Sequence, residues 1–239
     1  MQKKYIVPVV AVIVVVIGVV TYSVLNDYMG NNIEVESVID QNNGASTSEE
    51  KLANNSEVAS ASVLSEELNG KWNIVNGSKV YWSVTTSKET VNFINEGVTG
   101  NWTLDVQNPT AITGEGVVDM NSLDSGNAQR DSHVKERSDL LAVSEHPQAT
   151  FVAKSFSDFP TDWIAGTVVP LTIEGTIKVK GMEKDVEFES EVMYKDGQLL
   201  LSGETIVTFE DFGMQSPHTV VLEAENELIV QLELILNKG

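Results

Sequence analysis

The 239-residue sequence has no cysteine, only three histidines, and 15 basic residues against 35 acidic ones. The absence of cysteine excludes disulfides, thiolate metal sites, cysteine nucleophiles and a lipid-modified cysteine anchor. The net charge of −20 argues against binding to nucleic acid, because clustered Lys and Arg are needed to displace counterions from phosphates. The same charge argues against electrostatic adhesion to anionic lipid head groups.

Recognisable catalytic and metal-binding motifs are also missing. His133, His146 and His218 lack paired metal-ligand spacing, so we expect no metal site. The sequence has neither a nucleophile elbow nor a Gly-rich phosphate loop. The tripeptide 211–213 (Asp-Phe-Gly) stands without the other kinase motifs, and we expect a turn between strands there. We therefore predict a protein that is not an enzyme, with no catalytic residues and no cofactor.

An uncharged apolar run of 21 residues, 5–25, follows Lys3 and Lys4. At about 1.5 Å per residue such a helix spans roughly 30 Å, the thickness of a bilayer core. The preceding lysines place the N-terminus in the cytoplasm. We predict a single-pass transmembrane anchor over residues 1–25, with the rest of the chain extracytoplasmic. A cleaved signal peptide is the alternative, but the run is long for one and no A-x-A-like site follows it.

Residues 26–70 are rich in Asn, Ser, Glu and Ala, with one lysine, Lys51, and no aromatic residue beyond Tyr28 before residue 70. Such a segment cannot bury enough apolar surface to offset its ordering entropy. We predict an acidic disordered linker here. As a flexible coil it would average on the order of 35–40 Å from end to end.

From residue 71 to residue 239, apolar and polar residues alternate repeatedly, with turn residues between the runs. Alternation with one polar face is typical of antiparallel strands. Eight or so strands with short hairpins fit a barrel or a sandwich. Residues 125–144 lack the alternation and are expected to form a short helix and loop. The strand patterns contain glycines, which favour a tightly curved, closed barrel; they are Gly100, Gly114, Gly116, Gly175 and Gly203.

Several stretches in order resemble the YceI-like family of exported bacterial proteins. Residues 171–192 resemble that family's Gly-x-(Leu/Ile)-x-(Val/Ile)-x-Gly hairpin, and residues 209–214 resemble its Asp-Phe-Gly element. The resemblance covers about residues 72–236. Its strongest part is residues 118–151, with a Ser-x-x-(Ser/Thr)-Gly-Asn element, an Arg-Asp-x-His element and a Pro before an aromatic strand, here Ser122, Ser125, Gly126, Asn127, Arg130, Asp131, His133, Pro147 and Phe151.

The resemblance implies a lipocalin-like, eight-stranded antiparallel barrel similar to polyisoprenoid-binding proteins with a long apolar cavity. It predicts a non-enzymatic carrier of a long apolar, polyisoprenoid- or lipid-like molecule at the outer face of the cytoplasmic membrane. The alternative is a structural or protein-interaction barrel with a filled lumen, and a homodimer stays open. The sequence departs from the family pattern at Gly77-Ser78, Phe209 and Leu140-Leu141, where His-Ser, Arg and an aromatic pair are usual. If those residues contact a head group, this chain binds a different one or none.

Closing the sheet turns one face of each strand inward, where an eight-stranded barrel has space for side chains or one slender ligand. Trp82 and Trp102 therefore either plug the barrel or line a cavity. Arg130, Asp131 and His133 either line its mouth or form a network that orders a loop. The predicted ligand-binding residues are Val80, Trp82, Val84, Trp102, Leu104, Val118, Phe151, Ile177, Phe188 and Val207, with Leu141 and His133 near a mouth.

Overall fold

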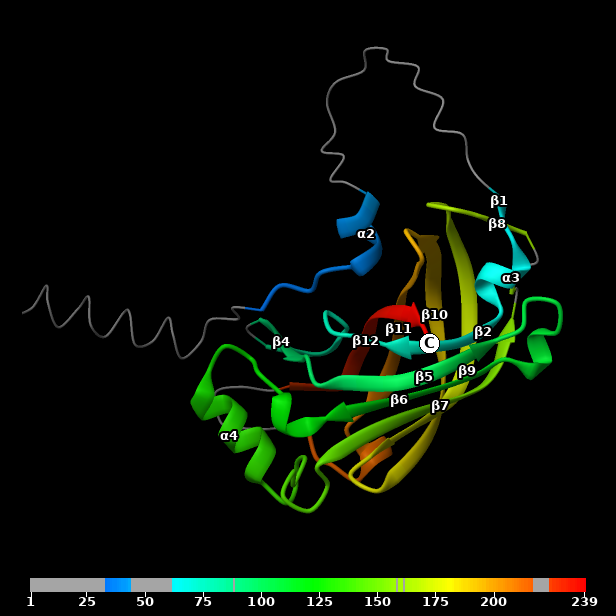
Figure 1. The fold of residues 1–239 in the computed structure, drawn as a ribbon. Coiled ribbons are helices and arrows are strands. Elements are labelled where there is room, and N and C mark those ends of the chain that lie inside the picture. The colour runs from blue at the N-terminus through cyan, green and yellow to red at the C-terminus, as the bar shows by residue number, and fades with distance from the viewer. Residues whose placement is uncertain (1–32, 44–61, 88, 158, 161, 217–223) are drawn as a thin grey trace, which may run out of the picture.

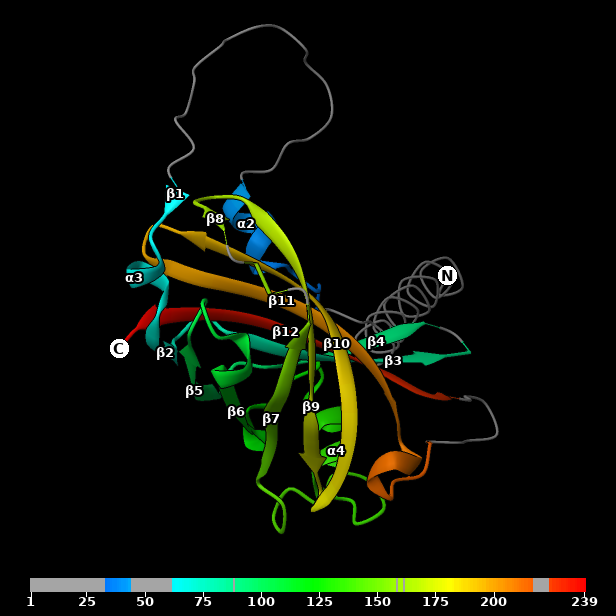
Figure 2. The same ribbon diagram turned by 90° about the vertical axis from the view of Figure 1, so that its right-hand side faces the viewer.

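The computed structural model describes residues 33–43, 62–87, 89–157, 159–160, 162–216 and 224–239 (Figure 1). Its central feature is an antiparallel barrel of eight strands, so the predicted all-β class is confirmed (Figure 2). The last strand of the ring pairs back with the first, which closes the sheet. In hydrogen-bonded order the ring is β11 (Gln198–Thr208), β10 (Met182–Lys195), β9 (Val168–Val179), β7 (Gln148–Ser157), β6 (Thr113–Asp119), β5 (Val98–Leu104), β2 (Gly70–Ile74) and β12 (Ala224–Lys238).

A hairpin of β3 (Lys79–Thr86) and β4 (Thr90–Asn95) lengthens the barrel at one side. β3 pairs with the same edge of β12 as β2 does, farther along that long strand. The next position in the sheet is divided in the same way: β5 pairs with β2, and β4 pairs with β3. The chain steps between β2 and β3 through a turn at Gly77, whose φ of 97° favours glycine.

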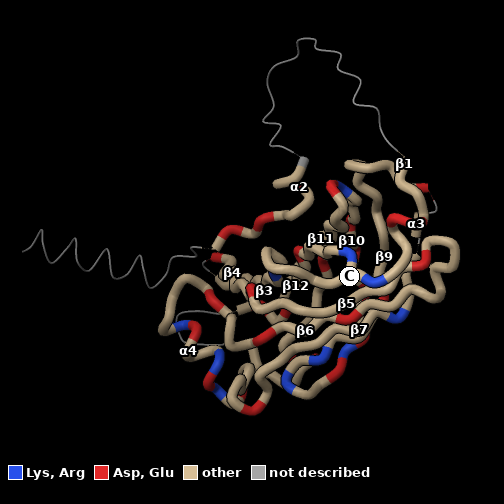
Figure 3. The backbone as a smooth tube through the Cα atoms, viewed as in Figure 1, with Lys and Arg blue, Asp and Glu red and all other residues tan. Residues whose placement is uncertain are grey.

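The predicted alternation is visible in the burial of the strands. On β9, every second residue from Leu171 to Val179 is buried, and the residues that alternate with them, 172, 174, 176 and 178, are not. These inward side chains join those of the other strands in one continuous hydrophobic core. Acidic residues are frequent along the chain (red in Figure 3), and on β10 Glu187, Glu189 and Glu191 are exposed. The wet outer face and dry inner face explain why the sheet closes.

Short helices join some of the strands. α4 (Ala128–Glu136) lies in the segment predicted to contain a helix, and Asn127 caps it by accepting hydrogen bonds from the backbone N–H groups of residues 129 and 130. The turn η3 (Glu210–Phe212) ends at Gly213 with a φ of 62°, which confirms the turn predicted at the Asp-Phe-Gly sequence. The remaining short turns are η1 (Pro109–Ala111) and η2 (Met120–Ser122).

The predicted disordered linker needs correction at residues 33–43 and 62–70. α2 (Val38–Asn43) packs on the outer wall of the barrel, β1 (Ser62–Val63) pairs with β8 (Trp163–Ile164), and α3 (Ser65–Leu68) precedes β2. The predicted linker is polar on average, but it contains two short groups of apolar residues. These groups are enough to hold the ordered pieces against the folded barrel. The predicted transmembrane anchor and residues 26–32 and 44–61 lie outside the described residues. Within the described ranges, no helix is long and apolar enough to cross a bilayer.

Residues 33–43 form a strap across the outside of β3, β4, β12 and β11. Val38 and Ile39 are 5% and 2% exposed and pack against Met193 and Leu200 of the barrel wall. Polar contacts hold the rest of the strap: the Ile33 carbonyl accepts from Asn92, the Glu36 carboxylate pairs with Lys79 at 3.0 Å, and the Asn42 carbonyl accepts from Lys195.

A buried carboxyl group, Glu233 of β12, lies beneath the strap and is 0% exposed. It accepts hydrogen bonds from the Val38 backbone N–H at 2.7 Å, from the Ser202 hydroxyl at 2.7 Å and from the Gln231 amide at 2.6 Å. Burial raises the pKa of Glu233 above its ordinary value of 4.5, and the three hydrogen bonds oppose that rise. The folded protein therefore holds this proton more tightly than the unfolded chain does.

Replacing Glu233 with Gln should change how stability depends on pH. The raised pKa stabilises the folded state. This stabilisation is fully present below pH 4.5 and is lost as the pH rises through the pKa of Glu233 in the folded protein. Glutamine keeps an amide in place but cannot ionise, so the variant should gain stability relative to the wild type as the pH rises from about 4 to 7. Urea unfolding across this range measures the difference. A difference that stays constant with pH would contradict the assignment.

Candidate functional site

The lumen of the barrel contains two small cavities. The first has about 40 Å³ of internal space and is lined by inward residues of seven barrel strands and β3, with Thr150 the single hydroxyl among apolar side chains. The second has about 20 Å³ and a wholly apolar lining. Roughly 10–15 Å³ accommodates one water-sized sphere, so the first cavity has room for about three. Side chains therefore fill most of the lumen, and the space that remains has an almost wholly apolar lining.

Trp102 separates the two cavities, because it is the single residue that lines both. It is 4% exposed and lies on β5, opposite Gly114 of β6. Its ring meets Phe156 in an edge-to-face contact with 5.7 Å between the centroids. Phe156 in turn contacts Phe159, and Phe159 contacts Trp163, all within the lining of the second cavity.

The structure places most of the predicted lumen residues at these cavities. Leu104 lines the second cavity. Val84 and Val207 are buried in the core but line neither cavity. Leu141 is partly buried against the core, and His133 is exposed on α4, so neither reaches the lumen. The predicted residues that line the first cavity are Val80, Trp82, Trp102, Val118, Phe151, Ile177 and Phe188.

The prediction from the sequence missed some of the lining residues. The second cavity depends on Phe156 near the end of β7, Phe159 in the connection after it and Trp163 in the two-residue strand β8, and no alternation marks an inward face there. Other members follow the alternation and could have been found from it: Ile74, Val98, Ala149, Val230, Leu232 and Leu234 at the first cavity, and Leu171, Val192, Leu199, Leu201 and Leu236 at the second.

Two of the strand glycines make room for aromatic rings and not for a ligand. A Cβ atom at Gly114 would lie 2.7 Å from the Trp102 ring, and one at Gly175 would lie 2.3 Å from the Phe151 ring. Both distances are far below van der Waals contact. These two glycines therefore do not leave the lumen open, because the neighbouring rings occupy the space.

Gly116 is the strand glycine that does leave space open in the lumen. A Cβ atom there would have the Ile74 Cδ1 atom as its nearest neighbour, 4.0 Å away. Gly116 also lines the first cavity. A side chain at this position would therefore grow into the cavity, which makes Gly116 the natural position at which to close it.

The predicted network of Arg130, Asp131 and His133 is divided in the structure. Asp131 is buried and accepts hydrogen bonds from the Ser125 backbone N–H at 3.0 Å and the Ser125 hydroxyl at 2.5 Å. The Arg130 Nε–H donates to the same hydroxyl at 3.1 Å. Burial raises the pKa of Asp131, while the bonds from Ser125 act in the opposite direction. These three residues order the start of α4.

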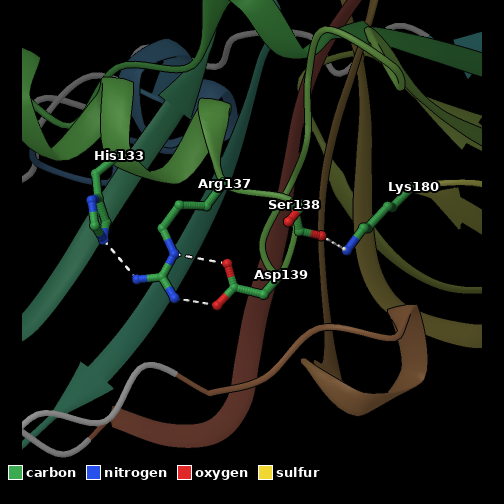
Figure 4. Close-up of polar contacts among 5 residues, drawn as sticks. All are labelled: His133, Arg137, Ser138, Asp139 and Lys180. Atoms are coloured by element: carbon green, nitrogen blue, oxygen red, sulfur yellow. Dashed lines mark hydrogen bonds and ion pairs between the residues drawn. The ribbon is translucent and has the colours of Figure 1, made fainter.

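His133 belongs to a separate surface cluster beside the end of α4, shown in Figure 4. Its Nε2 atom lies 2.9 Å from Arg137 Nη1, and Arg137 forms a two-pronged ion pair with Asp139. The hydrogen bonds from Arg137 lower the pKa of Asp139. Lys180, at the β9–β10 turn, donates to the Ser138 carbonyl at 2.6 Å. The cluster fixes the loop after α4 to the barrel rim, and among the described residues no group of three or more acidic or histidine side chains could hold a metal ion.

Replacing Asp131 with Ala tests whether its role is structural. The change leaves the Ser125 N–H and hydroxyl without their acceptor, which should lower the free energy of unfolding by about 1–3 kcal/mol. Urea unfolding measures that loss, with Asp105→Ala, which removes the acceptor of exposed bonds from the backbone N–H groups of Gln107 and Asn108, as the matched control. Unchanged stability together with weaker ligand binding would instead favour a role at the mouth.

Comparison with known proteins adds to this geometry. Residues 72–234 match the family model described as "YceI-like domain". A UPF0312 protein of Pectobacterium carotovorum is 26% identical over 148 residues, which are 58% of this chain and 70% of that protein. Protein YceI of Salmonella newport is 31% identical over 94 residues, which are 39% of this chain and 44% of that protein.

Solved structures share the fold at low sequence identity. A polyisoprenoid binding domain from Saccharophagus degradans, implicated in plant cell wall breakdown, superposes with a TM-score of 0.59 and 11% identity, over 70% of this chain and 98% of that one. BcnA of Burkholderia cenocepacia gives a TM-score of 0.56 and 17% identity, over 66% of this chain and 95% of that one. At these identities the likeness establishes the barrel fold alone.

Proposed function

Because the chain belongs to the YceI-like family, we propose that its barrel binds a long apolar, polyisoprenoid- or lipid-like molecule in the lumen. The observation that carries the proposal is the apolar lining of the lumen. Both cavities are lined without a charged side chain, and Trp102 lines both of them. Each methylene buried in such a site contributes about 0.8 kcal/mol, so a long chain needs no strong polar contact. The relative from Saccharophagus degradans, described as a polyisoprenoid binding domain, supports the same ligand class.

A long ligand requires the lumen to rearrange. The cavities of about 40 and 20 Å³ are too small for an isoprenoid chain. Rotation of the Trp102 ring away from Gly114 would join them into one channel. The neighbouring Phe156, which is only partly buried, would have to move with it. The resting barrel is thus a closed state, and binding replaces contacts among aromatic side chains with contacts to the ligand.

The proposal places the barrel close to the outer face of the cytoplasmic membrane. The predicted anchor ends at residue 25, and the strap begins at residue 33 on the barrel wall. Seven residues between them can reach at most about 25 Å. The strap thereby replaces the longer predicted tether and would keep the barrel within reach of lipids in the bilayer, from which an apolar ligand could be taken up.

A structural or protein-interaction role with a filled lumen is the second candidate. The small volume of both cavities favours it, since a barrel that never opens would look the same. Native mass spectrometry of the full chain released from nanodiscs separates the two. Binding predicts a stoichiometric adduct with the mass of an apolar lipid. Protein free of any adduct, after exposure to membranes rich in polyisoprenoids, would support the filled barrel.

A further inference from the structure

The four tryptophans differ in what their indole N–H groups contact. Trp72 donates to the Leu68 carbonyl at 2.7 Å. Trp163 donates to the Pro160 carbonyl at 2.9 Å. Trp82 donates to the Asn95 side-chain oxygen at 2.9 Å. In the part of the chain that the structure describes, the buried Nε1 atom of Trp102 has no hydrogen-bond partner.

The residue that carries this unpaired donor lines both cavities. A buried N–H without an acceptor is destabilising, and native proteins satisfy nearly all of them, so an exception calls for an explanation. The Phe156 ring is near, but an aromatic ring is at best a weak acceptor. The one hydroxyl in the lining of the first cavity belongs to Thr150, and no hydrogen bond joins it to Trp102. The lumen itself therefore does not satisfy this donor.

We infer that the ligand of the lumen carries an oxygen acceptor part-way along its length, which accepts a hydrogen bond from Trp102 Nε1–H. A carbonyl, ether or hydroxyl oxygen would serve. The inference rests on the proposed function and narrows it from any apolar chain to an apolar chain interrupted by one acceptor. In a dry site, a single such contact sets selectivity, because the site's own donor stays unpaired with a pure hydrocarbon.

Two probes of equal length test the inference: 6-undecanone, with a carbonyl at mid-chain, and undecane. Both are volatile, so headspace gas chromatography measures their uptake by the full chain in phospholipid vesicles, and protein-free vesicles correct for partition into lipid. After correction for partition into the membrane, the wild type should bind the ketone about fivefold more tightly than the alkane. This ratio corresponds to the typical net contribution of one neutral hydrogen bond. This comparison needs no variant.

Trp102→Phe should remove that preference, lowering ketone binding about fivefold relative to the alkane. Trp82→Phe is the matched control, because Trp82 lines the same cavity but its N–H already has an acceptor in Asn95. The control should keep the preference, even if the overall affinity changes. Thermal unfolding followed by circular dichroism checks that both variants fold.

The outcomes separate the inference from the function it rests on. If the wild type binds both probes with no preference for the ketone, the inference is overturned and apolar binding stands. A loss of affinity for both probes alike in Trp102→Phe, with the preference kept, also overturns it. If the wild type takes up neither probe, both the inference and the proposed function fail.

Discussion

The variant Gly116→Leu should fold normally and lose ligand binding. The new side chain would extend into the first cavity, where the nearest atom to a Cβ at this position is 4.0 Å away. Its four carbons would occupy the space that a bound chain needs, and so displace about three methylenes of the ligand. At about 0.8 kcal/mol per methylene, affinity should fall at least about 50-fold. Stability should change by less than about 2 kcal/mol, because the leucine fills an existing void.

Binding of a radiolabelled isoprenoid to the full chain in vesicles measures this loss. Val117→Leu is the matched control, since the neighbouring residue points to the opposite face of β6 and is half-buried. The control should bind like the wild type. If Gly116→Leu binds as well as the control does, the ligand lies outside the lumen, and the interaction-module candidate gains support.

The variant Gly100→Ala should prevent stable folding. Gly100 has a φ of 154°, a conformation that L side chains rarely adopt, and a Cβ atom there would lie 2.1 Å from the backbone oxygen of Glu115. Both strands would have to separate to relieve the overlap, which would break pairing between β5 and β6 near the middle of the barrel. Backbone strain and overpacking together should lower the free energy of unfolding by more than about 3 kcal/mol.

The matched control for this prediction is Gly116→Ala, because Gly116 is the register partner of Gly100 across the same pair of strands. A methyl group at Gly116 has 4.0 Å of clearance. The control should therefore keep its stability to within about 1 kcal/mol. Urea unfolding of the two variants measures the difference. Equal stability would show that the strand pair adapts easily and that the glycine is not required at Gly100.

The barrel was predictable because apolar and polar residues alternate along its strands. Alternation on β9, such as Leu171, Ile173, Ile177 and Val179, specifies which face is dry, and this pattern repeats along the chain. Inward residues such as Phe188 and Val118 were found in the same way. The lack of alternation in residues 125–144 correctly predicted a short helix there, α4. Local patterns thus determine the fold and much of the lumen lining.

The state of the lumen was not predictable, because it depends on which side chains meet across the barrel. Nothing in the sequence around Gly114 or Gly175 indicates that Trp102 and Phe151 fill the space beside them. Trp102 and Trp82 look alike in the sequence, yet one donor is satisfied and the other is not. The strap was hidden for a related reason. Two adjacent apolar residues, Val38 and Ile39, are too few to mark a folded segment until a complementary surface is known.

Photo-crosslinking with an isoprenoid that carries a diazirine tests most directly whether the lumen is the binding site. The full chain in vesicles would be irradiated with the probe and mapped by tandem mass spectrometry. Lumen binding, with Trp102 displaced, predicts adducts in both cavities, for example at Val118 and Phe188 in the first and at Leu104 and Leu199 in the second. Adducts confined to the outer wall, such as Ile206 or Met182, would contradict it.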